Sequence, residues 1–188
     1  MSPAVRRYLL LEQGIGAAVF NFLLNAAIAW AMFRSVEVVP LWGQQSIMGD
    51  TIGTCFLLPL LTSLIATRLV RGHVRMGKVA ALGWTRASHP VLGWLPQSTA
   101  RRGVVLGLAC IALLAPLAFL GLRLFGVASL PFWRFIAFKG AFAGVAAALV
   151  TPLVALWVIA EVPVPGEEAT AAPARRVEQS SHAPSGPM

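Results

Sequence analysis

The stretch Pro40-Leu-Trp-Gly-Gln-Gln-Ser-Ile-Met-Gly49-Asp50-Thr-Ile-Gly53 has an altered copy 91 residues later, which reads Pro131-Phe-Trp-Arg-Phe-Ile-Ala-Phe-Lys139-Gly140-Ala-Phe-Ala-Gly144. Both copies keep Pro-x-Trp, six further residues and then Gly-x-x-x-Gly, and both lead into a long apolar run. Between residues 36–53 and 127–144, 5 of 18 aligned positions are identical without a gap. An apolar composition seldom matches proline, tryptophan and two glycines together. The pattern therefore predicts a chain built from two tandem repeats.

Long apolar runs around both copies predict membrane spans. The chain is 57% hydrophobic and only 12% charged, about half the charged fraction of a soluble domain. Four uncharged runs are 17 to 21 residues long, close to the ~20 residues that a helix needs to cross the hydrocarbon. The runs are continuous rather than alternating, which favours helices over barrel strands. We therefore expect an all-α integral membrane protein with four transmembrane helices, at about residues 14–33, 50–70, 103–124 and 135–160.

The four expected spans form one membrane domain over residues 1–161. Each repeat contains two spans, so each is expected to be a helical hairpin, and the two hairpins share one orientation. Their pseudo-twofold axis then runs along the membrane normal, as in transporters with parallel repeats. After Glu161 the chain becomes rich in proline, alanine and serine, which cannot form a core. Residues 162–188 are therefore expected to be a disordered cytoplasmic tail.

Basic residues indicate the orientation of the chain. Seven of them lie between the second and third spans: Arg68, Arg71, Arg75, Lys78, Arg86, Arg101 and Arg102. Together with Arg6 and Arg7 they put nine on one side of the membrane, against four on the other. The positive-inside rule then places both termini in the cytoplasm. The composition is rich in alanine and arginine and poor in lysine, which we interpret as bacterial, and hence as an inner-membrane protein.

The same basic residues bear on the expected partners. The net charge of +8 is compatible with nucleic acid, but no nucleic-acid-binding motif accompanies it, so we expect no such partner. The lipid bilayer is the expected partner. The basic loop at 68–102 is a candidate contact for anionic lipid, although an ordinary cytoplasmic loop has the same composition. Another copy of the chain or another membrane protein is the remaining candidate.

The two Gly-x-x-x-Gly motifs are predicted to pack helices together. Gly49 and Gly53 lie in the second span, Gly140 and Gly144 lie in the fourth, and both spans cross in the same direction. Small residues at this spacing let parallel helices approach closely. We therefore expect these four glycines to form a seam between the second and fourth spans.

This seam predicts an ion pair between Asp50 and Lys139. Asp50 follows one glycine and Lys139 precedes the other, so both side chains turn to the same side of the seam. If the second helix begins near Pro40, Asp50 lies about 15 Å from its end and inside the hydrocarbon, where a carboxylate needs a partner. The alternative is that Asp50 caps the second helix while Lys139 extends outward to the headgroups.

Three further polar residues complete the candidate intramembrane site. Asn21 and Asn25 are four residues apart and share one face of the first span, and Thr54 shares a face with Asp50. One interpretation is that the asparagines bond to neighbouring helices. The other is that they line the path of a solute.

Catalytic signatures are missing from the sequence. It has no Ser/His/Asp or Cys/His set, no paired carboxylates and no phosphate-binding glycine loop, so we expect neither an enzyme nor a cofactor. Its histidines and cysteines have no ligand spacing, so no metal is expected. A small-solute carrier or channel is the first functional hypothesis, and a non-catalytic assembly or accessory subunit of the membrane is the second. A polar cavity that reaches Asp50 favours the carrier, and a dry contact there favours the accessory subunit.

Overall fold

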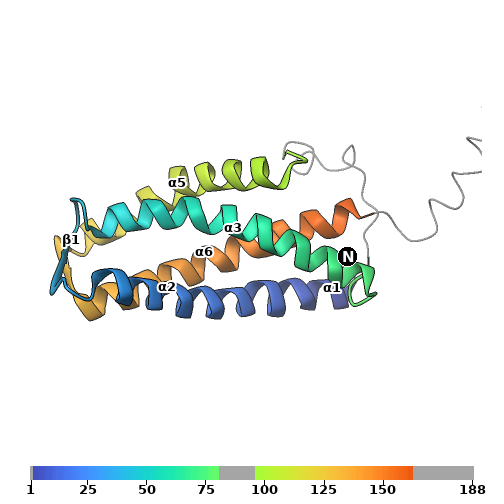
Figure 1. Ribbon diagram of the computed structural model, residues 1–188, viewed down its shortest axis with the longest axis horizontal. Helices are drawn as coiled ribbons and strands as arrows, with labels where there is room; N and C mark the ends of the chain where they lie inside the picture. The colour runs from blue at the N-terminus through green and yellow to red at the C-terminus, as the bar shows by residue number, and fades with distance from the viewer. Residues whose placement is uncertain (1, 81–95, 163–188) are drawn as a thin grey trace, which may run out of the picture.

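A computed structural model describes residues 2–80 and 96–162, and most of them are helical (Figure 1). The first long helix is continuous from α1 (Pro3–Arg7) through the π-helix η1 (Tyr8–Gly16) to α2 (Ala17–Phe33). The others are α3 (Ile47–Arg75), α5 (Thr99–Leu124) and α6 (Phe132–Glu161). These four helices of the described chain are long and apolar enough to cross a membrane, as predicted. They are candidate spans and indicate a multi-pass membrane protein.

Each of these helices is longer than its predicted span. Polar residues that flank the apolar runs, such as Arg71 and Arg101, are good helix formers and continue the helices. The predicted tail lies outside the described residues except for Val162, and so does the part of the basic loop at 81–95.

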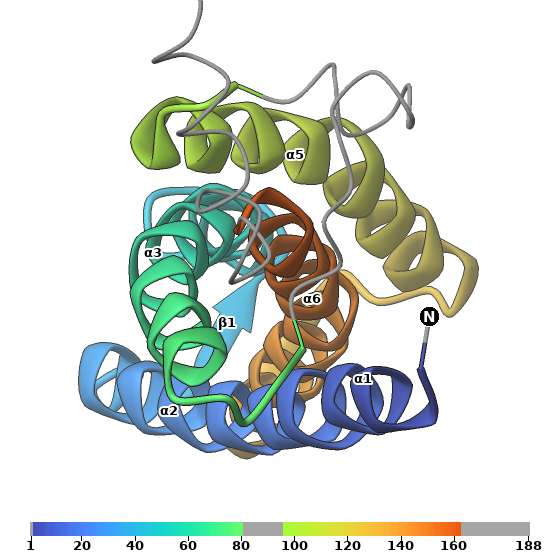
Figure 2. The same ribbon diagram turned by 90° about the vertical axis from the view of Figure 1, so that its right-hand side faces the viewer.

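The helices form three layers, which Figure 2 shows end-on. α3 and α6 lie side by side in the middle, with α2 on one side of them and α5 on the other. α2 packs chiefly on α6, and α5 packs chiefly on α3. The two helices of each predicted hairpin therefore do not pair with each other, and the two halves of the chain are interleaved. The expectation of helical hairpins was wrong in this respect, because each outer helix finds its closest fit on the opposite half.

Two glycines of α6 bring α2 close. A Cβ added at Gly140 would lie 3.0 Å from the ring of Phe22, and one at Gly144 would lie 3.1 Å from the carbonyl oxygen of Ala18. Both separations are tighter than ordinary van der Waals contact, so a larger residue would push α2 away. The predicted partner of these glycines was wrong, because they face α2 rather than α3.

Gly49 and Gly53 of α3 do not form the predicted seam either. A Cβ at Gly53 would meet nothing within 4 Å, and one at Gly49 would meet Ser46, which precedes the first turn of the same helix. The glycine spacing is visible in the sequence, but the helix that each glycine faces depends on how every helix is rotated in the bundle. α3 and α6 are in contact, and they share a hydrophobic core that includes Val70 and Val154.

A two-stranded antiparallel sheet joins the halves at one end of the bundle, which we call the sheet end (Figure 1). β1 (Val38–Pro40) pairs with β2 (Ser129–Pro131), and Val39 lies opposite Leu130. The all-α prediction missed this sheet, because strands of three residues are too short to show an alternating pattern. Val39 and Leu130 are also the two residues that the 91-residue offset aligns.

The two copies differ in how they lead into a helix. α6 starts directly after β2, whereas α3 starts only at Ile47, well after β1. In the intervening turn Gly43 adopts a φ of 136°, which favours glycine. Ser46 then caps α3 by accepting a hydrogen bond from the Gly49 amide at 3.1 Å. The expectation that this helix begins near Pro40 was therefore wrong, because a capped turn intervenes.

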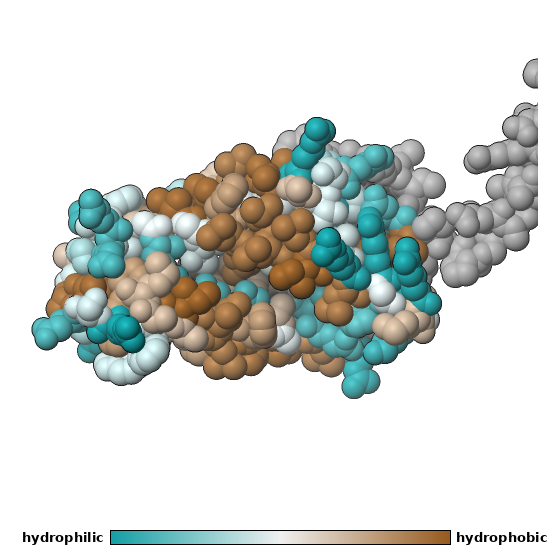
Figure 3. All heavy atoms as spheres, viewed as in Figure 1, coloured by the Kyte–Doolittle hydropathy of each residue, from teal (hydrophilic) through white to brown (hydrophobic). Residues whose placement is uncertain are grey.

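The surface of the bundle is apolar in the middle. Figure 3 shows a broad hydrophobic band across one face, with hydrophilic residues gathered toward the two ends. We call the end opposite the sheet the basic end, because basic residues of α1, α3 and α5 lie there: Arg6, Arg7, Arg68, Arg71, Arg75, Arg101 and Arg102. This distribution is the one expected of a protein whose middle contacts lipid and whose ends contact water.

The close approach of α5 to α3 gives a testable consequence. A Cβ at Gly103 would lie 2.9 Å from the Cα of Leu60, whereas a Cβ at Gly121 on the same helix would meet nothing within 4 Å. We expect Gly103→Ala to destabilise the protein by about 1–3 kcal/mol, because backbone must move to admit the methyl group. The measurement is Tm in detergent. Gly121→Ala is the matched control and should leave Tm unchanged or slightly raised, since alanine favours helix over glycine. Equal losses from both substitutions would contradict the close contact.

Candidate binding groove

A groove of about 720 Å³ runs between α2 and α3, and α6 closes its back. It exists because α2 and α3 pack on α6 rather than on each other. One wall extends from Glu12 to Phe33 and the other from Gly49 to Leu69, and α6 contributes two side chains. The volume is within the range of about 300–1,000 Å³ that is usual for small-molecule sites.

Polar residues recur along this groove at helical spacing. Gln13, Asn21 and Asn25 line it from the first long helix, and Asp50, Thr54 and Thr62 line it from α3. Separations of four or eight residues keep each set on one helix face. The structure thus brings all the predicted site residues into one cavity: Asn21, Asn25, Asp50, Thr54 and Lys139. Gln13 and Thr62 were not predicted as site residues, although both continue the same spacing.

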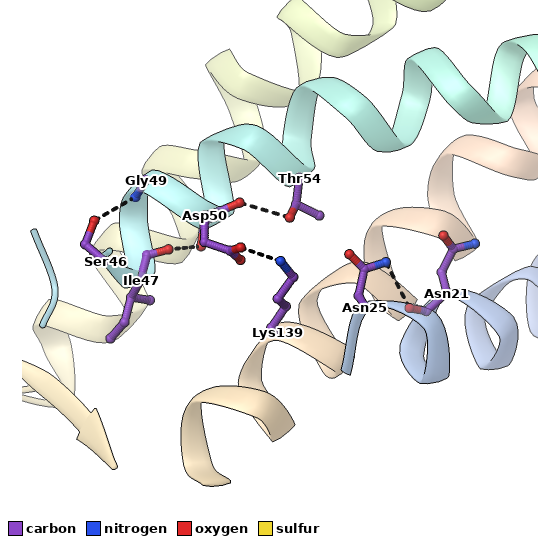
Figure 4. A network of polar contacts seen from close by, with 9 residues as sticks. Asn21, Asn25, Ser46, Ile47, Gly49, Asp50, Thr54 and Lys139 are labelled. Atoms are coloured by element: carbon purple, nitrogen blue, oxygen red, sulfur yellow. Dashed lines mark hydrogen bonds and ion pairs between the residues drawn. The ribbon is translucent and has the colours of Figure 1, made fainter. Parts of the chain in front are cut away.

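An ion pair lies near the sheet end of the groove. The Lys139 ammonium donates to the Asp50 carboxylate, which confirms the predicted pair (Figure 4). The two side chains are only 6% and 10% exposed, so little water reaches either charge. Attraction between charges is stronger in such surroundings than in bulk water. Each residue therefore depends on the other for its solvation.

Asp50 is not the cap of α3, so the alternative interpretation was wrong. Ser46 occupies the cap position, and Asp50 lies in the first turn of the helix, where the positive end of the helix dipole favours a carboxylate. The expected distance of Asp50 from the start of its helix was also wrong. Because α3 begins at Ile47, Asp50 lies about 5 Å from the helix start. Lys139 lies seven residues into α6, about 10 Å along its axis.

The asparagine amides are satisfied within their own helix. Asn21 Nδ2 donates to the Ala17 carbonyl at 2.9 Å, and Asn25 Nδ2 donates to the Asn21 carbonyl at 3.0 Å. Among residues 2–80 and 96–162, neither amide bonds to another helix, which argues against the interpretation that they join helices. Figure 4 shows the oxygen of Asn25 directed toward the side on which Lys139 lies. Both asparagines therefore present acceptors to the groove.

A second polar cluster lies at the basic end of the groove. Gln13 donates to the Tyr8 hydroxyl at 3.0 Å, and that hydroxyl lies 2.9 Å from His73 Nδ1 on α3. Glu12 lines the groove beside Gln13. Tyr8 and Gln13 belong to η1, and π-helical geometry is rare and often occurs at functional sites. This cluster was not predicted, because Tyr8 and His73 are 65 residues apart in the chain.

A buried arginine lies outside the groove, between α3, α5 and α6. Arg102 is 1% exposed, donates to Thr67 Oγ1 at 2.6 Å and lies 3.7 Å above the ring centroid of Trp157. Arg102 was expected in the basic loop, but it lies in α5 and its side chain is directed inward. Nearby, Arg71 pairs with Glu161 at 3.2 Å. Two of the residues expected to face water or lipid thus contact side chains of other helices.

Comparison of the chain with known protein families, with curated proteins and with solved structures finds no match. The class of the protein therefore rests on its own fold. It is a helical protein with four membrane-length helices and a groove with a line of polar side chains that reaches a buried ion pair. Within the described ranges, no three metal-ligating side chains gather at one point.

Because Asp50 and Lys139 form an ion pair, we expect substitutions at these two residues to have coupled effects on stability. Asp50→Asn leaves the Lys139 ammonium without its partner in a site almost closed to water, where such losses reach about 3–5 kcal/mol. We expect a large drop in the free energy of unfolding in detergent, and Lys139→Met added to Asp50→Asn should recover part of it. Arg123→Met, which removes an exposed charge at the sheet end of α5, is the control and should change stability little. Additive effects of the two groove substitutions would show that the pair does not stabilise the fold.

Proposed function

We propose that the protein lies in the inner membrane of a bacterium as a four-span protein with its basic end in the cytoplasm. The apolar middle and hydrophilic ends of the bundle support insertion (Figure 3). The arginines of α1, of the C-terminal part of α3 and of the start of α5 support this orientation, because positive residues are retained on the cytoplasmic side. Both termini are then cytoplasmic, and the sheet end faces the periplasm.

We also propose that the two halves are copies of one unit, related by a pseudo-twofold axis along the membrane normal. Two backbone hydrogen bonds beside the sheet support this. The Leu41 amide donates to the Ala128 carbonyl at 2.9 Å, and the Phe132 amide donates to the Glu37 carbonyl at 2.9 Å. The 91-residue offset maps the first bond onto the second. It also maps the packing of α2 on α6 onto the packing of α5 on α3.

Reporter fusions test the orientation. Fusions after Val70 and at the C-terminus should show cytoplasmic reporter activity, because α3 and α6 both end at the basic end. A fusion near Val38, at the sheet end, should show periplasmic activity. Alkaline phosphatase and a fluorescent protein give opposite readouts in the two compartments and control for expression. Phosphatase activity from the fusion after Val70 would contradict the proposed orientation.

The function that the groove supports best is the binding and transfer of a solute, as in a small carrier. One observation carries this proposal: a cavity with a line of polar side chains reaches the buried Asp50–Lys139 pair. Ionisable groups inside a membrane protein are costly, and they often mark the path of a substrate. Asn21, Asn25 and Thr62 lie between that pair and the basic end, and they offer a solute successive hydrogen-bonding positions.

An accessory subunit is the second candidate, and the open side of the groove favours it. Large apolar side chains along both walls are exposed, among them Phe20, Leu24, Leu57 and Leu61. A helix of a partner protein would cover these walls and bury their apolar surface. It would also keep water away from Asn25. The access of water to Asn25 therefore separates the two functions.

Thiol labelling measures that access. In a chain whose Cys55 and Cys110 are replaced by alanine, Asn25→Cys should react with a charged, membrane-impermeant thiol reagent, because the groove holds water in a carrier. Leu117→Cys is the control. It is exposed on α5 and lies next to the position that the 91-residue offset aligns with Asn25, so it should face lipid and remain unlabelled. If neither cysteine reacts in intact cells or in vesicles, the accessory function is favoured.

A further inference from the structure

The groove combines a line of polar groups with two apolar walls. Apolar residues that line it and are themselves exposed are found on both sides of the opening: Phe20, Leu24 and Ile28 on α2, and Leu57, Leu61 and Ile65 on α3. The opening is on the outer surface of the bundle. In a membrane these walls contact acyl chains rather than water, because the middle of the bundle is then surrounded by hydrocarbon. An apolar chain therefore fits the walls better than a wholly polar solute does.

The groove is also long enough to connect the two leaflets. From Asp50 to Leu69, its α3 wall covers 20 residues, and the first and last of them are about 28 Å apart along the helix axis. The hydrocarbon core of a bilayer is about 30 Å thick. Polar groups lie toward both ends: Asp50 with Lys139 at the sheet end, and Gln13 with Glu12 at the basic end. A molecule bound at either end has its polar part near one surface of the membrane.

The ion pair restricts the charge of that polar part. Asp50 and Lys139 neutralise each other, and both are almost fully buried. A ligand with a single charge would pair with one of them and leave the other unpaired, which is strongly unfavourable at a buried site. A head that carries both an ammonium and a phosphate can pair with both residues. The Asn25 oxygen, directed toward the side on which Lys139 lies, offers the ammonium a further acceptor (Figure 4).

From these observations we infer that the groove takes a zwitterionic phospholipid and moves its head between the leaflets while its chains remain in the bilayer. This inference rests on the proposed function, because it names the substrate class of the same groove. Asn25, Asn21 and Thr62 lie between the two polar ends and replace part of the water that the head loses on the way. The movement follows the concentration gradient of the lipid and needs no other energy source.

Lipid transfer in reconstituted vesicles tests the inference. The full chain is placed in phosphatidylcholine vesicles that contain phosphatidylethanolamine with a fluorescent label on its acyl chain. Dithionite then reduces only the label in the outer leaflet. Protein-free vesicles should lose about half of their fluorescence, and vesicles with the protein should lose nearly all of it. Chain-labelled phosphatidylglycerol, whose head is anionic, should behave as in protein-free vesicles.

Two variants connect the transfer to the groove. Asn21→Leu combined with Asn25→Leu removes the amides of the polar line at nearly constant size, and it should slow transfer several-fold. Leu117→Ala, on the exposed face of α5 outside the groove, should transfer lipid at the original rate. Tm and the elution volume in detergent must match the parent chain in both variants, so that slow transfer is not a consequence of misfolding.

Three outcomes would overturn the inference: no transfer beyond that of protein-free vesicles, equal transfer of the anionic lipid, or an undiminished rate in the asparagine variant. The proposed function is judged separately, by labelling of Asn25→Cys in the same vesicles. Labelling without lipid transfer would leave a carrier of a water-soluble solute. Absence of both labelling and transfer would remove the carrier function as well.

Discussion

Close packing of α2 on α6 is the contact on which the groove depends. Gly140 and Gly144 let the backbone of α2 approach α6 at the level of Ala18 and Phe22. Held there, α2 does not close against α3, and the space between them remains open along most of their length. Helices in a bilayer associate through such close packing, because lipid is as apolar as their side chains and supplies no hydrophobic drive. Filling either glycine would push α2 away from α6, so the shape of the groove depends on these two positions.

The ion pair depends in turn on how the sheet holds the starts of α3 and α6. Backbone hydrogen bonds between β1 and β2 join the segments that precede the two helices. The capped turn delays α3 to Ile47 and leaves Asp50 in its first turn, where the helix dipole favours the carboxylate. Lys139 lies further along α6, and its long side chain reaches back to meet that carboxylate. The hydrogen-bonded backbone at the sheet end therefore positions two charges that neither helix could bury alone.

The two halves share this backbone arrangement but not the chemistry of the groove. At the positions that the 91-residue offset aligns with the site, the other half has apolar residues: Ala112 for Asn21, Pro116 for Asn25, Ala141 for Asp50 and Met48 for Lys139. The backbone arrangement needs only apolar helices, two short strands and small residues at close contacts, and both halves supply them. Polar lining costs stability in a membrane unless each group finds a partner. The polar residues of the groove between α2 and α3 are therefore not repeated at these four aligned positions.

Local properties of the sequence determined the helical class and the four membrane-length helices, because length and hydropathy are read without knowing any neighbour. The Asp50–Lys139 pair was predicted as well, although through a glycine seam that does not exist. Positions 91 residues apart have similar heights on the adjacent helices α3 and α6. Asp50 and Lys139 are close to that separation, so their side chains lie at similar heights whichever way the glycines face. Only the tertiary structure decided that α2 packs on α6, that the halves are interleaved, and that Gln13, Tyr8 and His73 meet at the basic end. The rotation of a helix and the neighbour on which it packs result from the packing of the whole bundle. They therefore cannot be read from any single stretch of sequence.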